Sequence, residues 1–245
     1  MQIKDSVVIV TGASSGIGLS TAHLLQEQGT KVVLAARSVE KLTEIARELP
    51  DSLVVPTDMT DFQTIKDMVQ KTESHYGRID ALINNAGRGY EATIEEIDPE
   101  TFERLYRLNV LGPVIAMQQV IPIMRKLGGG AIVNISSGTS LMKIPAYGAY
   151  SSSKRALNGL SLTATAELAA DNIKVSLVYP ALTATNFGVN KILSNSSAGQ
   201  DLKDRPATDY SDGDTPEYIA QIILKALVEG EAEYFAHERM KQLGS

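Results

Sequence analysis

The sequence predicts a doubly wound α/β fold, in which a parallel sheet of about seven strands has helices on both faces. Two observations predict it. Short β-rich runs alternate with longer helical segments along most of the chain. The runs are also continuously apolar rather than alternating, as strands are when helices cover both of their faces. The length of 245 residues suits a single domain over 1–245, since no linker or internal repeat divides the chain.

The predicted elements follow one another as strand and helix. Asp98-Pro99 marks a helix start, because an N-cap acid precedes a proline at the first helical position. Gly112-Pro113 and Pro122 fall inside that helical segment, so we expect a bend there. The predicted strands are 6–12, 31–37, 53–58, 81–87, 131–137 and 173–180, and the predicted helices are 17–28, 39–49, 61–76, 99–126, 150–170 and 215–229.

One segment departs from this alternation. Residues 186–214 are polar, rich in Gly, Ser and Asp, and only weakly periodic. An irregular segment of this length inside a compact domain is usually a functional loop or disordered. It leaves the carboxyl end of a predicted strand, which is where open α/β sheets bind ligands. We therefore predict that it forms a lid over the substrate.

The composition excludes several function classes. The chain has no cysteine, and its three histidines are scattered, so we expect neither thiol chemistry nor a bound catalytic metal. The net charge is −6 with no basic run, which argues against nucleic acid as a partner. No stretch is apolar for the roughly 18–20 residues of a membrane span. We expect a cytoplasmic protein without a membrane partner.

A glycine-rich loop follows the first predicted strand. The stretch "TGASSGIG", residues 11–18, opens a predicted helix. Glycines let the backbone turn sharply and approach a pyrophosphate, while the free N–H groups at the helix start face its negative charge. A tight structural turn is the plainer alternative, but the position in the first strand–helix unit favours a dinucleotide. The predicted contacts are Gly12, Ser14, Ser15, Gly16, Ile17 and Gly18.

The spacing T-G-x-x-x-G-x-G resembles that of the short-chain dehydrogenase/reductase family, and other motifs follow in that family's order to about residue 185. "NNAG" (84–87) is similar to the motif that ends its fourth strand, and "NISS" (134–137) followed by Y-x-x-x-K to its active site. "PALTAT" (180–185) is similar to its P-G-x-x-x-T, with Ala181 in place of the usual glycine. The resemblance implies a Rossmann-type NAD(P)-binding domain with further cofactor contacts at Asp58, Met59, Asn85, Ala86, Gly87, Pro180, Ala181, Thr183 and Thr185.

Two tyrosines compete for the catalytic role. Tyr150 and Lys154 are four residues apart, so they share a helix face. An ammonium about 4 Å away would lower the pKa of the phenol by about three units at an effective dielectric of about 20. Tyr147 lies two turns from Lys154, too far to receive that field. The family's serine precedes its tyrosine by thirteen residues, which pairs Tyr150 with Ser137, whereas Ser136 points to the opposite face of its strand.

The resemblance also implies a role for each predicted catalytic residue. Ser137 and Tyr150 hydrogen-bond the substrate oxygen, and Tyr150 transfers the proton. Lys154 lowers the pKa of the tyrosine and holds the nicotinamide ribose, while Asn109 orients a water that links the lysine to solvent. The plainer alternative for Asn109 is a satisfied polar residue at a helix bend. The predicted substrate pocket contains Ser137, Met142, Tyr147, Tyr150 and Phe187.

The end of the second predicted strand indicates which dinucleotide is used. Enzymes that prefer NAD place an acid near this point to bind the ribose 2′-hydroxyl. Here Arg37 and Ser38 occupy the position, and no acid precedes Glu40. A guanidinium suits a phosphate, so we predict NADP (NADPH) as the cofactor with Arg37 and Ser38 at its 2′-phosphate.

These observations predict an NADP(H)-dependent oxidoreductase that interconverts a small carbonyl compound and a secondary alcohol. Two alternatives stay open: a non-catalytic NADP(H)-binding sensor, and an epimerase or dehydratase of the same superfamily. A sensor would typically lack the tyrosine or the lysine, and the epimerase branch usually has a larger C-terminal domain. The resemblance further implies a homodimer or homotetramer assembled through the helices at about 99–126 and 150–170.

Overall fold

The computed structural model describes the whole chain except residues 184–186, 188–190, 194–212 and 244–245. Its main feature is a seven-stranded sheet with the order β3-β2-β1-β4-β6-β7-β9, in which every neighbouring pair is parallel. The predicted doubly wound parallel sheet is therefore confirmed. The strands are β1 (Val7–Thr11), β2 (Lys31–Ala36), β3 (Leu53–Pro56), β4 (Ala81–Asn84), β6 (Gly130–Ile135), β7 (Ile173–Tyr179) and β9 (Glu233–Phe235).

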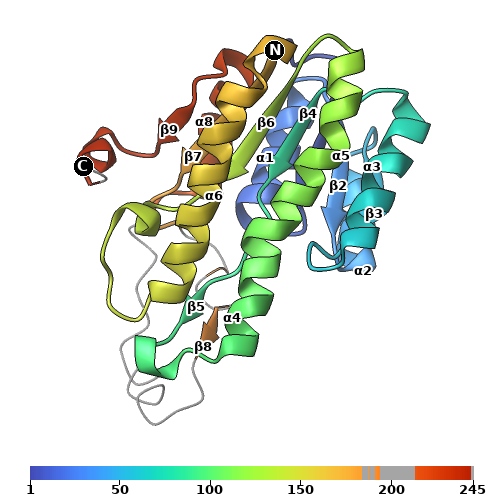
Figure 1. Ribbon diagram of the computed structural model, residues 1–245. Helices are drawn as coiled ribbons and strands as arrows, with labels where there is room; N and C mark the ends of the chain where they lie inside the picture. The colour runs from blue at the N-terminus through green and yellow to red at the C-terminus, as the bar shows by residue number, and fades with distance from the viewer. Residues whose placement is uncertain (184–186, 188–190, 194–212, 244–245) are drawn as a thin grey trace.

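Helices cover both faces of this sheet (Figure 1). Alternate residues of each strand point to opposite faces. Val8 and Val10 of β1 accordingly belong to one buried cluster with α1, α2 and α8, whereas Val7 and Ile9 belong to a second cluster with α3 and α5. The helices are α1 (Gly16–Glu27), α2 (Val39–Glu48), α3 (Phe62–Tyr76), α4 (Pro99–Tyr106), α5 (Gly112–Lys126), α6 (Gly148–Glu167) and α8 (Pro216–Glu229). Burial on both faces explains why the strands read as continuous apolar runs.

The helical segment predicted at 99–126 is interrupted once. Asp98 caps its start, as predicted, by accepting a hydrogen bond from the Thr101 N–H at 2.8 Å. A π-helical turn, Arg107–Leu111, then separates α4 from α5. The irregularity thus lies just before the predicted bend at Gly112-Pro113, and α5 continues through Pro122. Extra residues of this kind inside a helix are frequent at functional sites.

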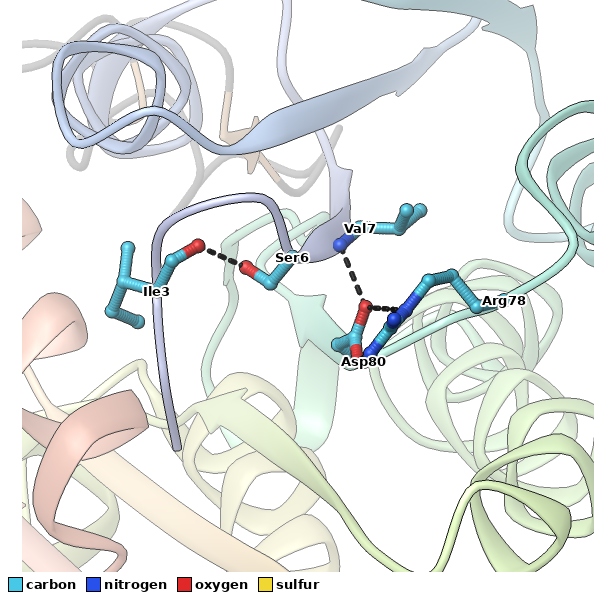
Figure 2. A network of polar contacts seen from close by, with 5 residues as sticks. All are labelled: Ile3, Ser6, Val7, Arg78 and Asp80. Atoms are coloured by element: carbon cyan, nitrogen blue, oxygen red, sulfur yellow. Dashed lines mark hydrogen bonds and ion pairs between the residues drawn. The ribbon is translucent and has the colours of Figure 1, made fainter.

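A polar network fixes the amino-terminal edge of the sheet, at the opposite end from the glycine loop (Figure 2). The Asp80 carboxylate accepts hydrogen bonds from the Val7 N–H and from Arg78 Nε, both at 2.8 Å. Asp80 also raises the pKa of the Arg78 guanidinium through this hydrogen bond and its charge. At the same edge the Ser6 hydroxyl donates to the Ile3 carbonyl. These contacts hold β1 in register with β4 before either strand reaches the functional edge.

Three short strands lie outside the sequence prediction. The seventh strand, β9, has only three residues, which is too short for a periodicity to mark it. A second, two-stranded sheet joins β5 (Tyr90–Glu91) and β8 (Ile192–Leu193). Most of the segment predicted as a lid, 186–214, lies outside the described residues; Phe187, Lys191–Leu193 and 213–214 are described. Across the described residues, no helix has the length and apolar character needed to cross a membrane.

Candidate active site

The loop between β1 and α1 has the geometry of an anion cradle. Gly12 and Gly16 adopt left-handed backbone angles, with φ of 69° and 54°. The N-cap residue of α1 is Ser15, which makes no side-chain cap hydrogen bond with any described residue. The first N–H groups of a helix have no partner within the helix, so here they can bind an external acceptor. Such an arrangement fits the pyrophosphate of a dinucleotide.

Gly18 shows how tightly this cradle is packed. A Cβ atom on residue 18 would lie 2.4 Å from the Gly12 carbonyl oxygen and 2.5 Å from Asn85 Nδ2, far inside van der Waals contact. A side chain at this position would push the β4 loop away from the glycine loop. The predicted contacts Gly12, Gly18 and Asn85 are therefore brought together, with Ser14, Ser15, Gly16 and Ile17 in the same loop.

Thr11 is a site residue that sequence reasoning missed. Its hydroxyl accepts hydrogen bonds from the Asn85 N–H at 3.0 Å and the Ala86 N–H at 3.1 Å, and it donates to the Ile83 carbonyl at 3.2 Å. The amide of Asn85 also donates to the Thr11 carbonyl at 2.9 Å. Thr11 thus joins the first loop to the loop that contains Asn85, Ala86 and Gly87. Its place at the head of the "TGASSGIG" stretch was the available signal.

Ser137 and Tyr150 meet beyond the carboxyl end of β6. Ser137 begins a 3₁₀ turn, Gly138–Leu141, where its Oγ accepts hydrogen bonds from Thr139 N–H at 3.2 Å and Thr139 Oγ1 at 3.0 Å. Tyr150 lies in the first turn of α6, and its phenol is hydrogen-bonded with the Ser137 hydroxyl. Ser136 instead donates to Asn158 Oδ1, so the two neighbouring serines do face opposite ways. The structure thus pairs Tyr150 with Ser137.

The electrostatics at Tyr150 differ from the expectation. Burial raises the pKa of Tyr150 to about 12; the hydrogen bond from Ser137 lowers it, and Tyr147 raises it. The Lys154 ammonium donates to the Ile135 carbonyl at 2.8 Å, and burial lowers the pKa of Lys154 to about 8. The expected lowering of the tyrosine pKa is therefore wrong for this structure. Helical spacing puts the two groups on one face, but loss of hydration is the largest influence on the tyrosine pKa.

Asn109 lies inside the π-helical turn and is fully buried. Its Oδ1 accepts a hydrogen bond from the Arg88 N–H at 3.1 Å, and its Nδ2 donates to the Arg88 carbonyl at 3.0 Å and to Ser153 Oγ at 3.1 Å. A Cβ atom on Gly87 would lie 3.3 Å from Asn109 Oδ1 and 3.4 Å from Lys154 Nζ. The loop after β4, the π-helical turn and α6 therefore converge here. The water-orienting role of Asn109 stays a prediction.

The residues predicted at the adenine side lie at the ends of β2 and β3. Arg37 is exposed, and Ser38 caps α2 by accepting a hydrogen bond from the Lys41 N–H at 3.4 Å. The Ser38 hydroxyl donates to a Glu40 carboxylate oxygen at 3.1 Å. Asp58 Oδ1 accepts hydrogen bonds from the N–H and the hydroxyl of Thr60, at 2.9 and 2.8 Å, and Met59 next to it is buried.

The end of β7 reaches the same edge. The Pro180 carbonyl accepts a hydrogen bond from the Gly138 N–H at 2.8 Å, which links it to the turn that follows Ser137. The Thr183 hydroxyl donates to the Ala181 carbonyl at 3.1 Å. Pro180 therefore lies beside the turn that follows Ser137, and the predicted cofactor contacts at Pro180, Ala181 and Thr183 stay a prediction. The predicted contact Thr185 lies outside the described residues.

Of the predicted substrate residues, Phe187 contacts the ring of Tyr150 directly. The ring centroids of Phe187 and Tyr150 are 5.6 Å apart. Tyr147 is the N-cap residue of α6, and Met142 ends the turn after Ser137 with its side chain exposed. Arg155 was missed by the sequence analysis: its guanidinium donates to the Ser140 carbonyl at 2.7 Å and the Met142 carbonyl at 2.8 Å, which holds that turn against α6.

The fold and this edge of the sheet define a class of protein: a dinucleotide-binding α/β domain with a serine, a tyrosine and a lysine at one site. The family model described as short chain dehydrogenase matches residues 6–195. The chain therefore belongs to the short-chain dehydrogenase family of oxidoreductases.

Individual relatives agree with this assignment. An uncharacterised oxidoreductase of Staphylococcus saprophyticus is 35% identical over 190 residues, which are 76% of this chain and 81% of the relative. The crystal structure of L-sorbose reductase from Gluconobacter frateurii, complexed with NADPH and L-sorbose, matches with a TM-score of 0.83 at 29% identity, over 96% of this chain and 97% of that one. A short-chain dehydrogenase/reductase from Burkholderia phymatum in complex with NAD shares the fold, with a TM-score of 0.90 at 23% identity over 99% and 92% of the two chains.

The buried lysine predicts a pH dependence of stability. Lys154 has a pKa of about 8 in the folded protein, against an ordinary lysine value of 10.5. Between these values the unfolded chain binds more protons, so stability rises with pH. We expect wild type to gain on the order of 3 kcal/mol over Lys154→Met between pH 7 and pH 10.5. Urea unfolding of both proteins across this range measures it. A stability difference that is constant with pH would contradict the burial of the charged amine.

Proposed function

We propose that the protein is an NADP(H)-dependent oxidoreductase that interconverts a carbonyl compound and a secondary alcohol. The observation that carries the proposal is that Ser137 and the buried Tyr150 phenol come together at one site, with Lys154 one helical turn further along α6. Membership of a family of oxidoreductases supports it. The cradle formed by Gly12, Gly18 and the β4 loop fits the dinucleotide that such a reaction needs.

The chain's own residues account for binding the substrate oxygen and moving the proton. When bound, the nicotinamide supplies a hydride for the carbonyl carbon, or accepts one from the alcohol. Ser137 donates a hydrogen bond to the substrate oxygen, and Tyr150 gives its phenolic proton to that oxygen as the carbonyl is reduced. A pKa of about 12 keeps the phenol protonated at neutral pH, which suits an acid in the direction of reduction. In the reverse direction the same phenol must first lose its proton.

Lys154 and Asn109 would support this proton transfer. The amine of Lys154 lies against the Ile135 carbonyl and beside Gly87, at the edge where a ribose bound in the cradle would end. We propose that Lys154 holds the ribose hydroxyls and becomes able to lower the tyrosine pKa once the dinucleotide is bound. Asn109 fixes the backbone of Arg88 and with it the loop beside that amine. These are the roles that the family pattern implies for the two residues.

The preference for NADP rests on the end of β2. The Arg37 side chain is exposed and able to turn toward a 2′-phosphate, and the N-terminus of α2 adds unpaired N–H groups next to it. The Ser38 hydroxyl would exchange its bond to Glu40 for one to the phosphate. The similarity to a sorbose reductase solved with NADPH supports this choice.

The substrate and the assembly are also part of the proposal. Phe187 packs against Tyr150 and is partly exposed, and Met142 is exposed at the end of the turn after Ser137, which suits a small, mainly apolar carbonyl or alcohol. Leu160 and Leu162 are exposed on α6, where a second copy of the chain would cover them. We therefore propose a homodimer or homotetramer that uses this helix.

The two tyrosines give the direct test of the mechanism. Tyr150→Phe removes only the phenolic hydroxyl, so turnover of carbonyl substrates with NADPH should fall at least about 100-fold while NADPH binding is kept. Tyr147→Phe, the matched control three residues away, should keep most of kcat. Steady-state assays across a panel of ketones and aldehydes measure both, with NADPH binding followed by fluorescence. The opposite ranking of the two variants would overturn the assignment.

The cofactor preference is tested separately. Wild type should have the higher kcat/KM with NADPH than with NADH, and Arg37→Ala should lower this ratio roughly tenfold or more by weakening NADPH alone, since a charge-assisted hydrogen bond is lost. Arg47→Ala, which removes an arginine from the last turn of α2, should leave the ratio unchanged. Equal use of NADH and NADPH by wild type would refute the preference.

A further inference from the structure

The two-stranded sheet brings together segments that lie 100 residues apart in the chain. Its strands are parallel, with Tyr90 opposite Ile192 and Glu91 opposite Leu193, and the Ile192 N–H donates to the Gly89 carbonyl at 2.9 Å. Figure 1 shows β5 and β8 side by side, apart from the main sheet. Two residue pairs give little stability by themselves, since even a full hairpin is marginal in water. Side chains must therefore hold the two segments together.

A buried ion pair provides that contact. The Lys191 ammonium is paired with the Glu91 carboxylate. Glu91 is only 5% exposed and stands between Tyr90 and Ala92, which are also buried. An ionised carboxylate at such a position is strongly disfavoured without a cation. Since Lys191 supplies the cation, the ion pair ties residues 191–193 to β5.

The side chains of Phe187 and Lys191 both pack closely against Gly89. A Cβ atom at residue 89 would lie 3.2 Å from the Phe187 ring and 3.3 Å from Lys191 Cβ, closer than nearly all real contacts of this kind. On its other side the Phe187 ring packs against the ring of Tyr150, with centroids 5.6 Å apart and planes inclined by 53°. A continuous set of contacts therefore runs from the ion pair, across Gly89 and Phe187, to the predicted proton donor.

The far end of β5 is fixed as well. The Ala92 N–H donates to the Ala146 carbonyl at 2.8 Å, and Ala146 immediately precedes Tyr147, the N-cap residue of α6. Residue 146 holds a left-handed backbone angle, φ 66°, which is uncommon outside glycine. The strand that contains Glu91 is thus tied to the start of the helix that presents Tyr150. The segment that contains β5 therefore contacts Phe187 through Gly89 and contacts the start of α6 through Ala92.

We propose that the Glu91–Lys191 ion pair positions Phe187 against Tyr150, and that the ring held there makes the site select apolar over hydroxylated carbonyl substrates. This inference rests on the proposed function for its substrate. Phe187 is 39% exposed, so one part of its ring contacts Tyr150 while another part is open to a ligand. An apolar substituent on a carbonyl held by Tyr150 gains burial against that ring. A hydroxylated substituent loses hydration there without gaining a hydrogen bond from the ring.

The first experiment needs no turnover. The chain has no tryptophan, so Phe187→Trp gives a single fluorescent reporter at the contact. Adding Glu91→Gln should shift its emission to the red, because the ring is released toward water, and adding Lys191→Met should do the same. The control is Glu100→Gln, which removes an exposed carboxylate whose partner, Arg104, is also exposed; it should leave the emission unchanged. Unchanged emission in the Glu91 and Lys191 variants would overturn the positioning role.

The second experiment measures selectivity with matched ketones. The acetophenone preference is the ratio of kcat/KM for acetophenone to kcat/KM for dihydroxyacetone. It is measured for wild type and for each variant, without the Phe187→Trp substitution. Glu91→Gln should lower the acetophenone preference roughly tenfold, mainly through KM, and Phe187→Ala should lower it at least as far. The charge exchange Glu91→Lys with Lys191→Glu should restore part of it. Lys191→Met, which breaks the same ion pair, replaces Glu91→Gln if that variant does not fold by circular dichroism. An unchanged preference in Glu91→Gln and Phe187→Ala would overturn the selectivity.

The two readouts separate this inference from the proposed function. If wild type reduces neither these ketones nor any other carbonyl in the panel, the proposed function and the selectivity assigned to Phe187 both fail. The tryptophan emission still decides, in that case, whether the ion pair holds the ring.

Discussion

The hydroxyl of Thr11 is the contact on which the rest of the site depends. It accepts the N–H groups of Asn85 and Ala86 and donates to the Ile83 carbonyl, so one side chain satisfies two main-chain donors of the loop after β4. Main-chain N–H groups inside a protein need a hydrogen-bond acceptor, and here the Thr11 hydroxyl is that acceptor. This contact sets the spacing between the glycine loop and the loop that ends at Gly87. A dinucleotide bound at one loop therefore meets the other at a fixed distance.

The catalytic side is built outward from the same loop. Gly87 lies beside the Lys154 amine, and Asn109 holds the next residue, Arg88, through both its N–H and its carbonyl. Asn109 lies in the π-helical turn, and its side-chain amide reaches the backbone of Arg88. A π-helical turn changes the direction in which a side chain leaves a helix, and such turns are frequent at functional sites. Burial then sets the chemistry, because it raises the pKa of Tyr150, which keeps the phenol protonated, and lowers the pKa of Lys154. The protein so prepares a proton donor before any substrate arrives.

The sequence predicts what is local and the structure adds what is distant. The strands, the glycine loop and the pairing of Ser137 with Tyr150 could be found because short motifs and fixed spacings carry them. The raised pKa of Tyr150 could not, since it depends chiefly on how deeply the phenol is buried. The Glu91–Lys191 ion pair could not be predicted from the sequence either, because no motif near Glu91 or Lys191 indicates a partner 100 positions away. The strand β9 was not predicted, because three residues are too few to show a periodic pattern of apolar side chains.

One binding measurement tests the central claim most directly. Thr11→Val keeps the shape of the side chain but removes the acceptor of the Ala86 N–H and one of the two acceptors of the Asn85 N–H. Thr72→Val is the matched control, since the buried Thr72 hydroxyl donates to the Met68 carbonyl within its own helix. Calorimetric titration with NADPH should show binding to wild type, a similar affinity in Thr72→Val and roughly tenfold weaker binding in Thr11→Val. Equal affinities in all three proteins, or no binding of NADPH to wild type, would contradict the account.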